Sequence, residues 1–199
     1  MQIFKSVITN ILIALYQPFW FAVILSALYM FVWKNYKSVK SALKQWIHWF
    51  KTESSFRRMF LFVFYIVMIL FRTLINRNMW QNPLQDIMGT WWLYKYDSTK
   101  NQMILTTEVL ENLALFIPFA VLLLWTYRDK ILNKVTLVHT LWQSTKIVFL
   151  FSFSIEFLQL FLRLGTWQLS DLFYNTVGGF IGGLVYWIGY RIKHRGAEL

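Results

Sequence analysis

Five stretches of almost continuous apolar residues divide the chain, and charged residues gather between them. These stretches cover residues 6–33, 59–75, 112–127, 147–162 and 172–190. A helix needs about 20 apolar residues to cross the hydrocarbon core of a bilayer. The first stretch is longer and is expected to bend at Pro18, whereas the second to fourth are short and need aromatic or charged anchors at their ends. The pattern predicts about five transmembrane helices.

Composition favours the same fold class. The chain has 199 residues, of which 57% are hydrophobic and 20% aromatic. This exceeds the apolar content of an ordinary soluble domain. We therefore predict an all-α integral membrane protein, a bundle of about five transmembrane helices with one interfacial amphipathic helix. We assign an N-terminal helix and a basic interfacial helix to 1–58, and the main membrane domain to 59–195.

The predicted interfacial helix lies within residues 34–58, where apolar and basic side chains fall largely on opposite helical faces. The apolar face consists of Val39, Leu43, Trp46, Ile47 and Phe50. The basic face consists of Lys37, Lys40, Lys44 and Lys51. Such a helix lies in the headgroup plane of a membrane, so we expect it to orient the protein.

The distribution of lysine and arginine predicts the orientation. Fourteen of the 20 lie in residues 34–58, in 128–146 and after residue 190, and the other six lie elsewhere. Because positive charge accumulates in cytoplasmic segments, we expect the N-terminus outside and the C-terminus in the cytoplasm. A signal peptide is the alternative for residues 1–33, but that apolar run is too long and the positive charge follows it.

The predicted outer loop, residues 76–110, is rich in aromatic side chains. They are Trp80, Trp91, Trp92, Tyr94 and Tyr96. They fit an interfacial belt, which is common in membrane proteins, and we favour this interpretation. The alternative is a lid or stacking surface over a site.

The fourth apolar stretch contains a polar stripe centred on Glu156. Ser152, Glu156, Gln159 and Arg163 recur at helical spacing and share one face. A carboxylate at that depth costs about 2.5–3.5 kcal/mol on insertion scales, and such residues are usually functional. The stripe indicates either a structural network between helices or a ligand or reaction site.

Further polar residues converge on the same predicted outer half of the membrane. Asp171 and Asn175 open the fifth stretch, and Glu108, Glu111 and Asn112 open the third. Arg72 approaches that level from the second stretch, and we expect it to pair with Glu156.

Close helix packing is expected in the fifth stretch. Gly178, Gly179, Gly182 and Gly183 form two overlapping pairs with four-residue spacing. Small residues at this spacing let helix backbones approach each other in membranes.

Several classes of chemistry are disfavoured. The chain has no cysteine, so disulfides, thiol catalysis and cysteine-ligated metals are excluded. His48, His139 and His194 all fall on the predicted cytoplasmic side, away from the outer cluster, so we expect no metal and no cofactor there. The net charge of +11 sits beside apolar spans, which favours anionic lipids as partners over nucleic acid.

Three motifs in the chain resemble motifs of the VanZ-like membrane proteins. They read Asn-x5-Pro in the third stretch, Glu-x2-Gln in the fourth and Asp-x3-Asn-x2-Gly in the fifth. The matching residues are Asn112, Pro118, Glu156, Gln159, Asp171, Asn175 and Gly178. The resemblance covers about residues 60–190. Gln168 departs from the resemblance, because many members carry at that position an aspartate that precedes the one matched by Asp171.

The resemblance implies a bacterial cell-membrane protein that reduces sensitivity to glycopeptide antibiotics with a lipid tail, such as teicoplanin. The partners expected at the outer cluster are membrane lipids, a lipid-linked cell-wall precursor or a lipoglycopeptide. Two alternatives stay open. One is a membrane enzyme that acts on a lipid-linked envelope molecule, with Glu156 and Asp171 as acid and base. The other is a structural or regulatory subunit, and the oligomeric state is open in each case.

Overall fold

A computed structural model describes residues 18–32, 39–75, 82–97 and 101–194, together with residues 5, 8–10, 12, 13 and 16. The helices are α2 (Phe19–Val32), α3 (Val39–Thr52), α4 (Ser54–Leu70), α5 (Glu108–Ile131), α6 (Leu137–Leu162) and α7 (Leu169–His194). A π-helical turn, Phe71–Ile75, extends α4. Two short strands, β1 (Tyr94–Asp97) and β2 (Gln102–Leu105), pair as an antiparallel hairpin.

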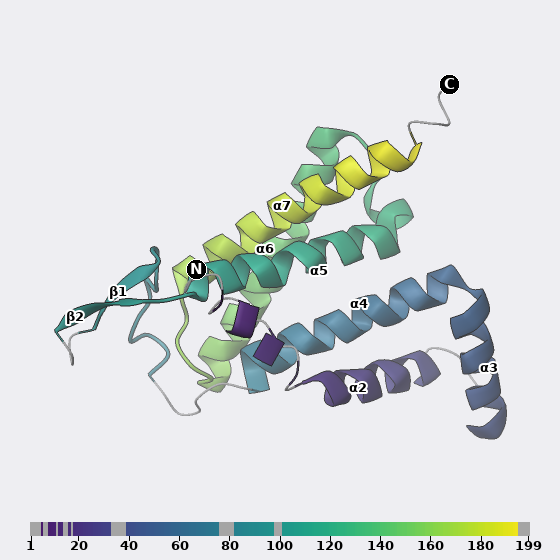
Figure 1. The fold of residues 1–199 in the computed structure, drawn as a ribbon, viewed down its shortest axis with the longest axis horizontal. Coiled ribbons are helices and arrows are strands. Elements are labelled where there is room, and N and C mark those ends of the chain that lie inside the picture. The colour runs from purple at the N-terminus through teal and green to yellow at the C-terminus, as the bar shows by residue number, and fades with distance from the viewer. Residues whose placement is uncertain are drawn as a thin grey trace.

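The main bundle consists of α4, α5, α6 and α7, which run alternately up and down (Figure 1). Its apolar core comes from α4, α5 and α6. The buried members are Phe62, Ile69, Phe116, Phe119, Ala120, Leu123, Val148 and Ile155. Aromatic rings join the helices, as where Phe119 stacks on Phe151 with ring centroids 4.6 Å apart. Packing of this apolar core aligns the polar ends of the helices.

Four glycines bring α7 against two neighbours at once. A Cβ on Gly182 would lie 2.5 Å from the carbonyl oxygen of Ile117 on α5, and one on Gly179 would lie 2.5 Å from the Cβ of Val148 on α6. Gly178 also faces α5, and Gly183 faces α6. Each pair with four-residue spacing therefore serves one partner helix, as the small-residue pattern predicts.

The N-terminal part flanks this bundle. Pro18 lies in a turn directly before α2, and α2 packs along α4. α3 crosses the far ends of α2 and α4 (Figure 1). Trp46 of α3 stacks on Phe50 and meets the ring of Phe60 edge-on. The side chains of Leu43 and Ile47 remain exposed, as suits a helix whose apolar face meets lipid.

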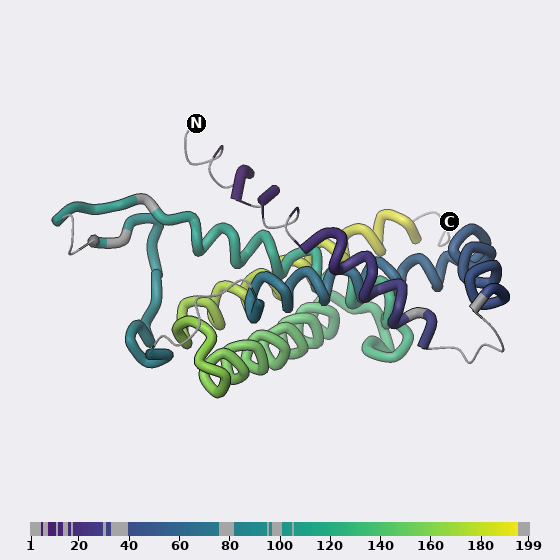
Figure 2. The backbone as a smooth tube through the Cα atoms, turned by 90° about the horizontal axis from the view of Figure 1, so that it is seen from below, coloured from purple at the N-terminus to yellow at the C-terminus, as the bar shows by residue number. Residues whose placement is uncertain are grey.

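The two ends of the bundle differ. We call one the hairpin end, where α4 and α6 finish, α5 and α7 begin, and the β1–β2 hairpin projects beyond the helices (Figures 1 and 2). The opposite end, crossed by α3, is the α3 end. The hairpin was not predicted, since residues 76–110 were expected to form a loop. The stretch 76–81 lies outside the described residues, and with it Trp80.

The prediction of an all-α membrane protein is confirmed. Three described helices are long and apolar enough to cross a membrane, namely Ser54–Ile75, Glu108–Ile131 and Leu137–Leu162. The apolar helix Phe19–Tyr29 is shorter. α7 spans 26 residues and lies alongside α5 and α6. Its hydropathy is lower because it contains several glycines and polar residues in its first turns. The glycines pack against neighbouring helices, and the polar residues belong to the site described next.

Candidate functional site

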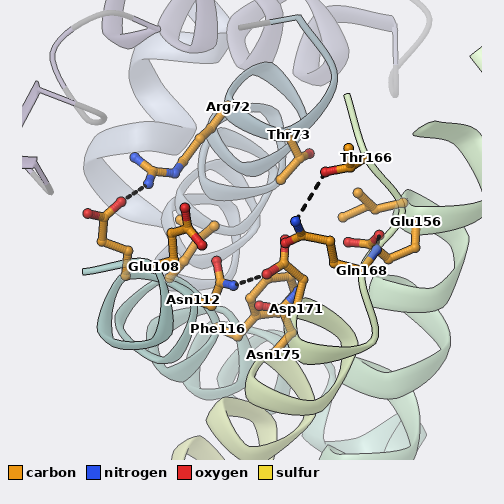
Figure 3. A pocket seen from close by; sticks show the side chains of 13 residues that line it. Arg72, Thr73, Glu108, Asn112, Phe116, Glu156, Thr166, Gln168, Asp171 and Asn175 are labelled. Atoms are coloured by element: carbon orange, nitrogen blue, oxygen red, sulfur yellow. Dashed lines mark hydrogen bonds and ion pairs between the residues drawn. The ribbon is translucent and has the colours of Figure 1, made fainter. Parts of the chain in front are cut away.

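A polar cavity of about 350 Å³ opens at the hairpin end. We call it the hairpin-end pocket (Figure 3). It collects side chains from the π-helical turn that extends α4, from α5, α6 and α7, and from the connection between α6 and α7. Its lining residues are Arg72, Thr73, Glu108, Glu111, Asn112, Leu115, Phe116, Ile155, Glu156, Thr166, Gln168, Asp171 and Asn175.

One wall is an ion pair between Arg72 in the π-helical turn and Glu111 in the first turn of α5. Thr107 donates a hydrogen bond to the same carboxylate. Asn10, from the N-terminal segment, donates to Glu111 Oε1 at 2.8 Å and to Thr107 Oγ1 at 3.0 Å. The carboxylate of Glu111 therefore joins three parts of the chain that are far apart in sequence.

The expected pairing of Arg72 with Glu156 is wrong. Arg72 pairs with Glu111, and Glu156 lies on the other side of the pocket (Figure 3). Depth in the membrane, on which the expectation was based, does not determine which helix lies beside Arg72. The π-helical turn that carries Arg72 packs against α6, but the Arg72 side chain extends to Glu111 in the first turn of α5.

Glu156 forms the opposite wall from within α6. Its side chain is 2% exposed, and its Oε2 accepts a hydrogen bond of 3.1 Å from the backbone N–H of Gln168. The side-chain amide of Gln168 donates to Thr166 Oγ1 and, at 3.3 Å, to Asp86 Oδ2. The connection between α6 and α7 thus folds back onto the buried carboxylate.

The floor of the pocket joins α5, α6 and α7. Asn112 Nδ2 donates to Asp171 Oδ1 at 2.8 Å. One turn further along α7, Asn175 Nδ2 donates to Ser152 Oγ at 2.9 Å. Asp171 lies in the first turn of α7, where the positive end of the helix dipole stabilises a carboxylate.

Two predicted site residues do not line the pocket. Gln159 is buried, but its Nε2 donates to the carbonyl oxygen of Thr73 at 2.7 Å and ties α6 to the π-helical turn. Arg163 is exposed and adopts a left-handed conformation, with φ of 54°. The helix ends at Leu162, so the predicted stripe is buried at Ser152, Glu156 and Gln159 and stops before Arg163.

Residues 82–91, in the predicted outer loop, pack over the connection between α6 and α7. The N–H groups of Trp167 and Leu169 donate to the carbonyl oxygens of Pro83 and Ile87 at 2.8 and 2.9 Å. Gly89, with φ of +66°, approaches so closely that a Cβ there would lie 2.1 Å from Ser170 Oγ. Residues 82–91 therefore cover the segment that carries Gln168.

The aromatic residues of this loop divide into two groups. Trp91 packs on Phe173, with ring centroids 5.5 Å apart, and its carbonyl oxygen accepts from the Tyr174 hydroxyl at 2.6 Å. Trp92 and Tyr94 are exposed. Trp91 thus belongs to the covering segment, whereas the exposed rings suit the predicted interfacial belt.

Three polar lining residues, Thr73, Thr166 and Gln168, were not among the residues predicted to converge here. Gln168 had a sequence signal, because it occupies the position where related proteins often carry an acid. Thr166 lies in a connection with no periodicity, and nothing in the sequence indicated it.

The lining is rich in acceptors. Its described part carries four carboxylates, on Glu108, Glu111, Glu156 and Asp171, and one cationic side chain, that of Arg72. Such a site suits a ligand with several hydroxyl, amide or ammonium donors. Among the described residues, no group of three or more His, Asp or Glu side chains is placed to hold a metal ion.

Comparison with known proteins gives one finding. Neither the curated proteins nor the solved structures contain a match. The VanZ/LLP1 family profile matches residues 5–190, so the match begins well before residue 60, where the resemblance of the motifs began. It includes α2 and α3, and a domain boundary at residue 58 stays a prediction. Because the match covers nearly the whole chain, the protein belongs to the VanZ/LLP1 family.

Proposed function

We propose that the hairpin-end pocket binds the polar part of an amphipathic envelope molecule in the outer leaflet, and that this binding reduces sensitivity to lipid-tailed glycopeptides of the teicoplanin type. The observation that carries the proposal is the burial of Glu156 and Asp171, 2% and 8% exposed, in one cavity at the end of apolar helices. Ionisable residues at such positions are costly and mark functional sites by default.

The charge distribution supports an outer-leaflet position. Lys40, Lys44, Lys51, Arg57 and Arg58 lie on α3 and the start of α4, at the end opposite the pocket. Positive charge accumulates in cytoplasmic segments. With the α3 end in the cytoplasm, the hairpin-end pocket faces outward, towards the leaflet in which a lipid-tailed antibiotic anchors.

The acceptor-rich lining favours a ligand with many donors, such as the sugar and peptide part of a lipid-linked cell-wall precursor or of the antibiotic itself. Each buried methylene of an acyl tail contributes about 0.8 kcal/mol to membrane anchoring. Anchoring therefore raises the local concentration of a tailed drug at the membrane. A protein that disturbs this anchoring weakens the tailed drug and leaves a tail-less drug unaffected.

Antibiotic susceptibility in cells with and without the protein tests this proposal. We expect protection against teicoplanin-like drugs and little against vancomycin-like drugs, which lack the tail. Glu156→Gln is expected to abolish protection at normal protein abundance, since glutamine still accepts the hydrogen bond from Gln168 and Arg72 keeps Glu111. Glu53→Gln makes the same chemical change at an exposed position at the α3 end and is the matched control. Equal protection against both drug classes contradicts the proposal.

A membrane enzyme is the second candidate, and it is favoured by two buried carboxylates lining one cavity. One acid would donate a proton while the other accepts one. Lipid mass analysis separates the two candidates. An enzyme changes the mass of an envelope lipid in an expression-dependent manner, whereas a binding protein co-purifies with an unmodified one.

A further inference from the structure

A second cavity, of about 520 Å³, lies at the α3 end. We call it the α3-end pocket. It lies between the last turns of α5 and α7, and Arg58 at the start of α4 closes one side. The function proposed above makes no use of this pocket, since the hairpin-end pocket lies at the opposite end of the bundle.

Cations from three helices line this cavity. They are Arg58 on α4, Arg128 on α5 and Lys193 on α7. The one acid among the described lining residues, Asp129, is exposed and pairs with Arg128, with Arg128 Nη2 2.7 Å from Asp129 Oδ1. Positive charge therefore exceeds negative charge in the lining, which is the opposite of the hairpin-end pocket.

Arg58 has donor capacity that the protein does not use. Its Nη1 donates to the carbonyl oxygen of Trp125 at 3.1 Å, which fixes the position of the guanidinium. Its Nε is buried, with no hydrogen-bond partner among the described residues. A buried donor without an acceptor is unfavourable. A ligand with anionic oxygens would supply the missing acceptor.

Aromatic rings hold the two arginines in place before any ligand binds. The guanidinium of Arg58 lies 6.0 Å from the centroid of the Trp125 ring, and that of Arg128 lies 5.7 Å from the Tyr190 ring. His194 stacks on the same tyrosine with ring centroids 4.0 Å apart. Groups held in this way lose little conformational entropy on binding.

The cavity also has room and an apolar side. A Cβ on Gly189 would meet no atom within 4 Å, unlike those on the four packed glycines of α7. Val121 and Val185 continue the lining along α5 and α7 towards the middle of the bundle, and Val185 is 47% exposed. A phosphate at the cationic rim would therefore leave its acyl chain against an apolar surface.

We propose that the α3-end pocket binds the phosphate group of an anionic phospholipid, with Arg58, Arg128 and Lys193 as the cationic contacts and Gly189 providing space. Inorganic phosphate could contact the same cationic side chains, but it has no acyl chain to pack against the apolar wall. The pocket is thus a lipid site in the leaflet next to α3, whose own lysines favour the same anionic leaflet.

The test uses the full-length protein in detergent, titrated with phosphatidylglycerol, with phosphatidylcholine or with inorganic phosphate. Thermal unfolding and native mass spectrometry report binding. We expect phosphatidylglycerol to stabilise the protein and the other two additives to have little effect. Arg128→Gln is expected to weaken phosphatidylglycerol binding by about fivefold, which corresponds to the contribution of one basic side chain near a membrane surface. Arg191→Gln, which removes an arginine from α7 outside the lining, is the charge-matched control.

Gly189→Trp tests the space without changing charge. The side chain would fill the cavity, so phosphatidylglycerol binding is expected to fall by about 25-fold or more, the effect of losing two or more of the cationic contacts. Gly189→Ala adds one carbon to open space and is expected to bind normally. Unchanged binding by both Gly189→Trp and Arg128→Gln, or equal stabilisation by phosphatidylcholine, overturns the proposal. Full stabilisation by inorganic phosphate alone overturns the assignment to a lipid.

Discussion

Asn112 on α5 donates a hydrogen bond of 2.8 Å to Asp171 on α7, although 59 positions separate them in the chain. The contact crosses the polar end of a helix pair that is otherwise held by glycine packing. It has a defined direction, because an amide donates and an ionised carboxylate only accepts. Exchanging the two residues should therefore preserve the bond and reverse its direction.

This relationship predicts a stability pattern for three variants. Asn112→Asp places two carboxylates in contact and is expected to destabilise the protein by about 1–3 kcal/mol. Asp171→Asn leaves two amides that still form a hydrogen bond, so it should cost less. The double exchange is expected to recover most of the stability lost in Asn112→Asp, as measured by thermal unfolding in detergent. No recovery in the double variant would mean that the contact contributes little to stability.

Helix packing gives a second prediction. Gly182→Ala would place a methyl group 2.5 Å from the backbone oxygen of Ile117, and backbone cannot move aside as a flexible side chain can. Overpacking of this kind typically costs about 1–3 kcal/mol. Gly189→Ala, on the same helix with open space, is the control and is expected to leave the unfolding temperature unchanged or slightly higher, because alanine favours helix. Equal unfolding temperatures for the two variants would contradict the packing found here.

Gln159 provides a third prediction, because its role differs from that of Glu156 one turn earlier. Gln159→Leu removes the donor to the Thr73 carbonyl oxygen and is expected to cost about 1–2 kcal/mol, the range for hydrogen bonds between helices in membranes. It should leave the pocket lining intact. Thermal unfolding compared with drug protection therefore separates the two residues, since Glu156→Gln is expected to affect protection more than stability. If the Gln159→Leu protein is fully stable but no longer protects cells from the drug, Gln159 belongs to the functional site and not to helix packing.

The polar face of α6 was predictable, and its partners were not. Helical spacing alone identified Ser152, Glu156 and Gln159 as one buried face, because a 3.6-residue period fixes which side chains share a direction. Spacing within a helix does not specify the neighbouring helix, so the expected pairing of Arg72 with Glu156 was wrong. The glycine pattern of α7 predicted close packing correctly, because small residues at this spacing let helix backbones approach each other.

Irregular segments contributed what sequence patterns could not indicate. Gln168 reaches the pocket because the loop of residues 82–91 fixes the connection between α6 and α7 by backbone hydrogen bonds. Backbone hydrogen bonds do not depend on the side chains, so the sequence does not indicate them. The hairpin was also missed. Its strands have four residues each and lie in a segment whose aromatic residues were interpreted as an interfacial belt.

Membrane orientation is the fourth prediction, and it is testable by labelling because the chain has no native cysteine. Asp97→Cys in β1 and Gln45→Cys in α3 lie at opposite ends of the molecule (Figure 1). An impermeant thiol reagent added to intact cells is expected to label position 97 and to reach position 45 only after permeabilisation. The reverse pattern would move the hairpin-end pocket to the cytoplasmic side and contradict the outer-leaflet proposal.

The ion pair between Arg72 and Glu111 predicts an asymmetry between its two members. Glu111 also accepts hydrogen bonds from Thr107 and Asn10, whereas Arg72 has no other ion pair among the described residues. The side chain of Glu111 is 12% exposed and that of Arg72 is 27% exposed. Loss of one member of a fully buried pair costs about 3–5 kcal/mol, and partial exposure of Arg72 reduces this value.

Glu111→Gln is therefore expected to destabilise the protein more than Arg72→Gln, because it leaves a cation without a counter-ion and weakens two further hydrogen bonds. Arg72→Gln leaves a carboxylate that keeps two donors. The double variant should be less destabilised than the sum of the single variants, since neither charge is then left alone. Thermal unfolding of the four proteins gives the coupling energy. Additive effects, or a larger loss in Arg72→Gln, would mean that the pair does not organise this wall of the pocket.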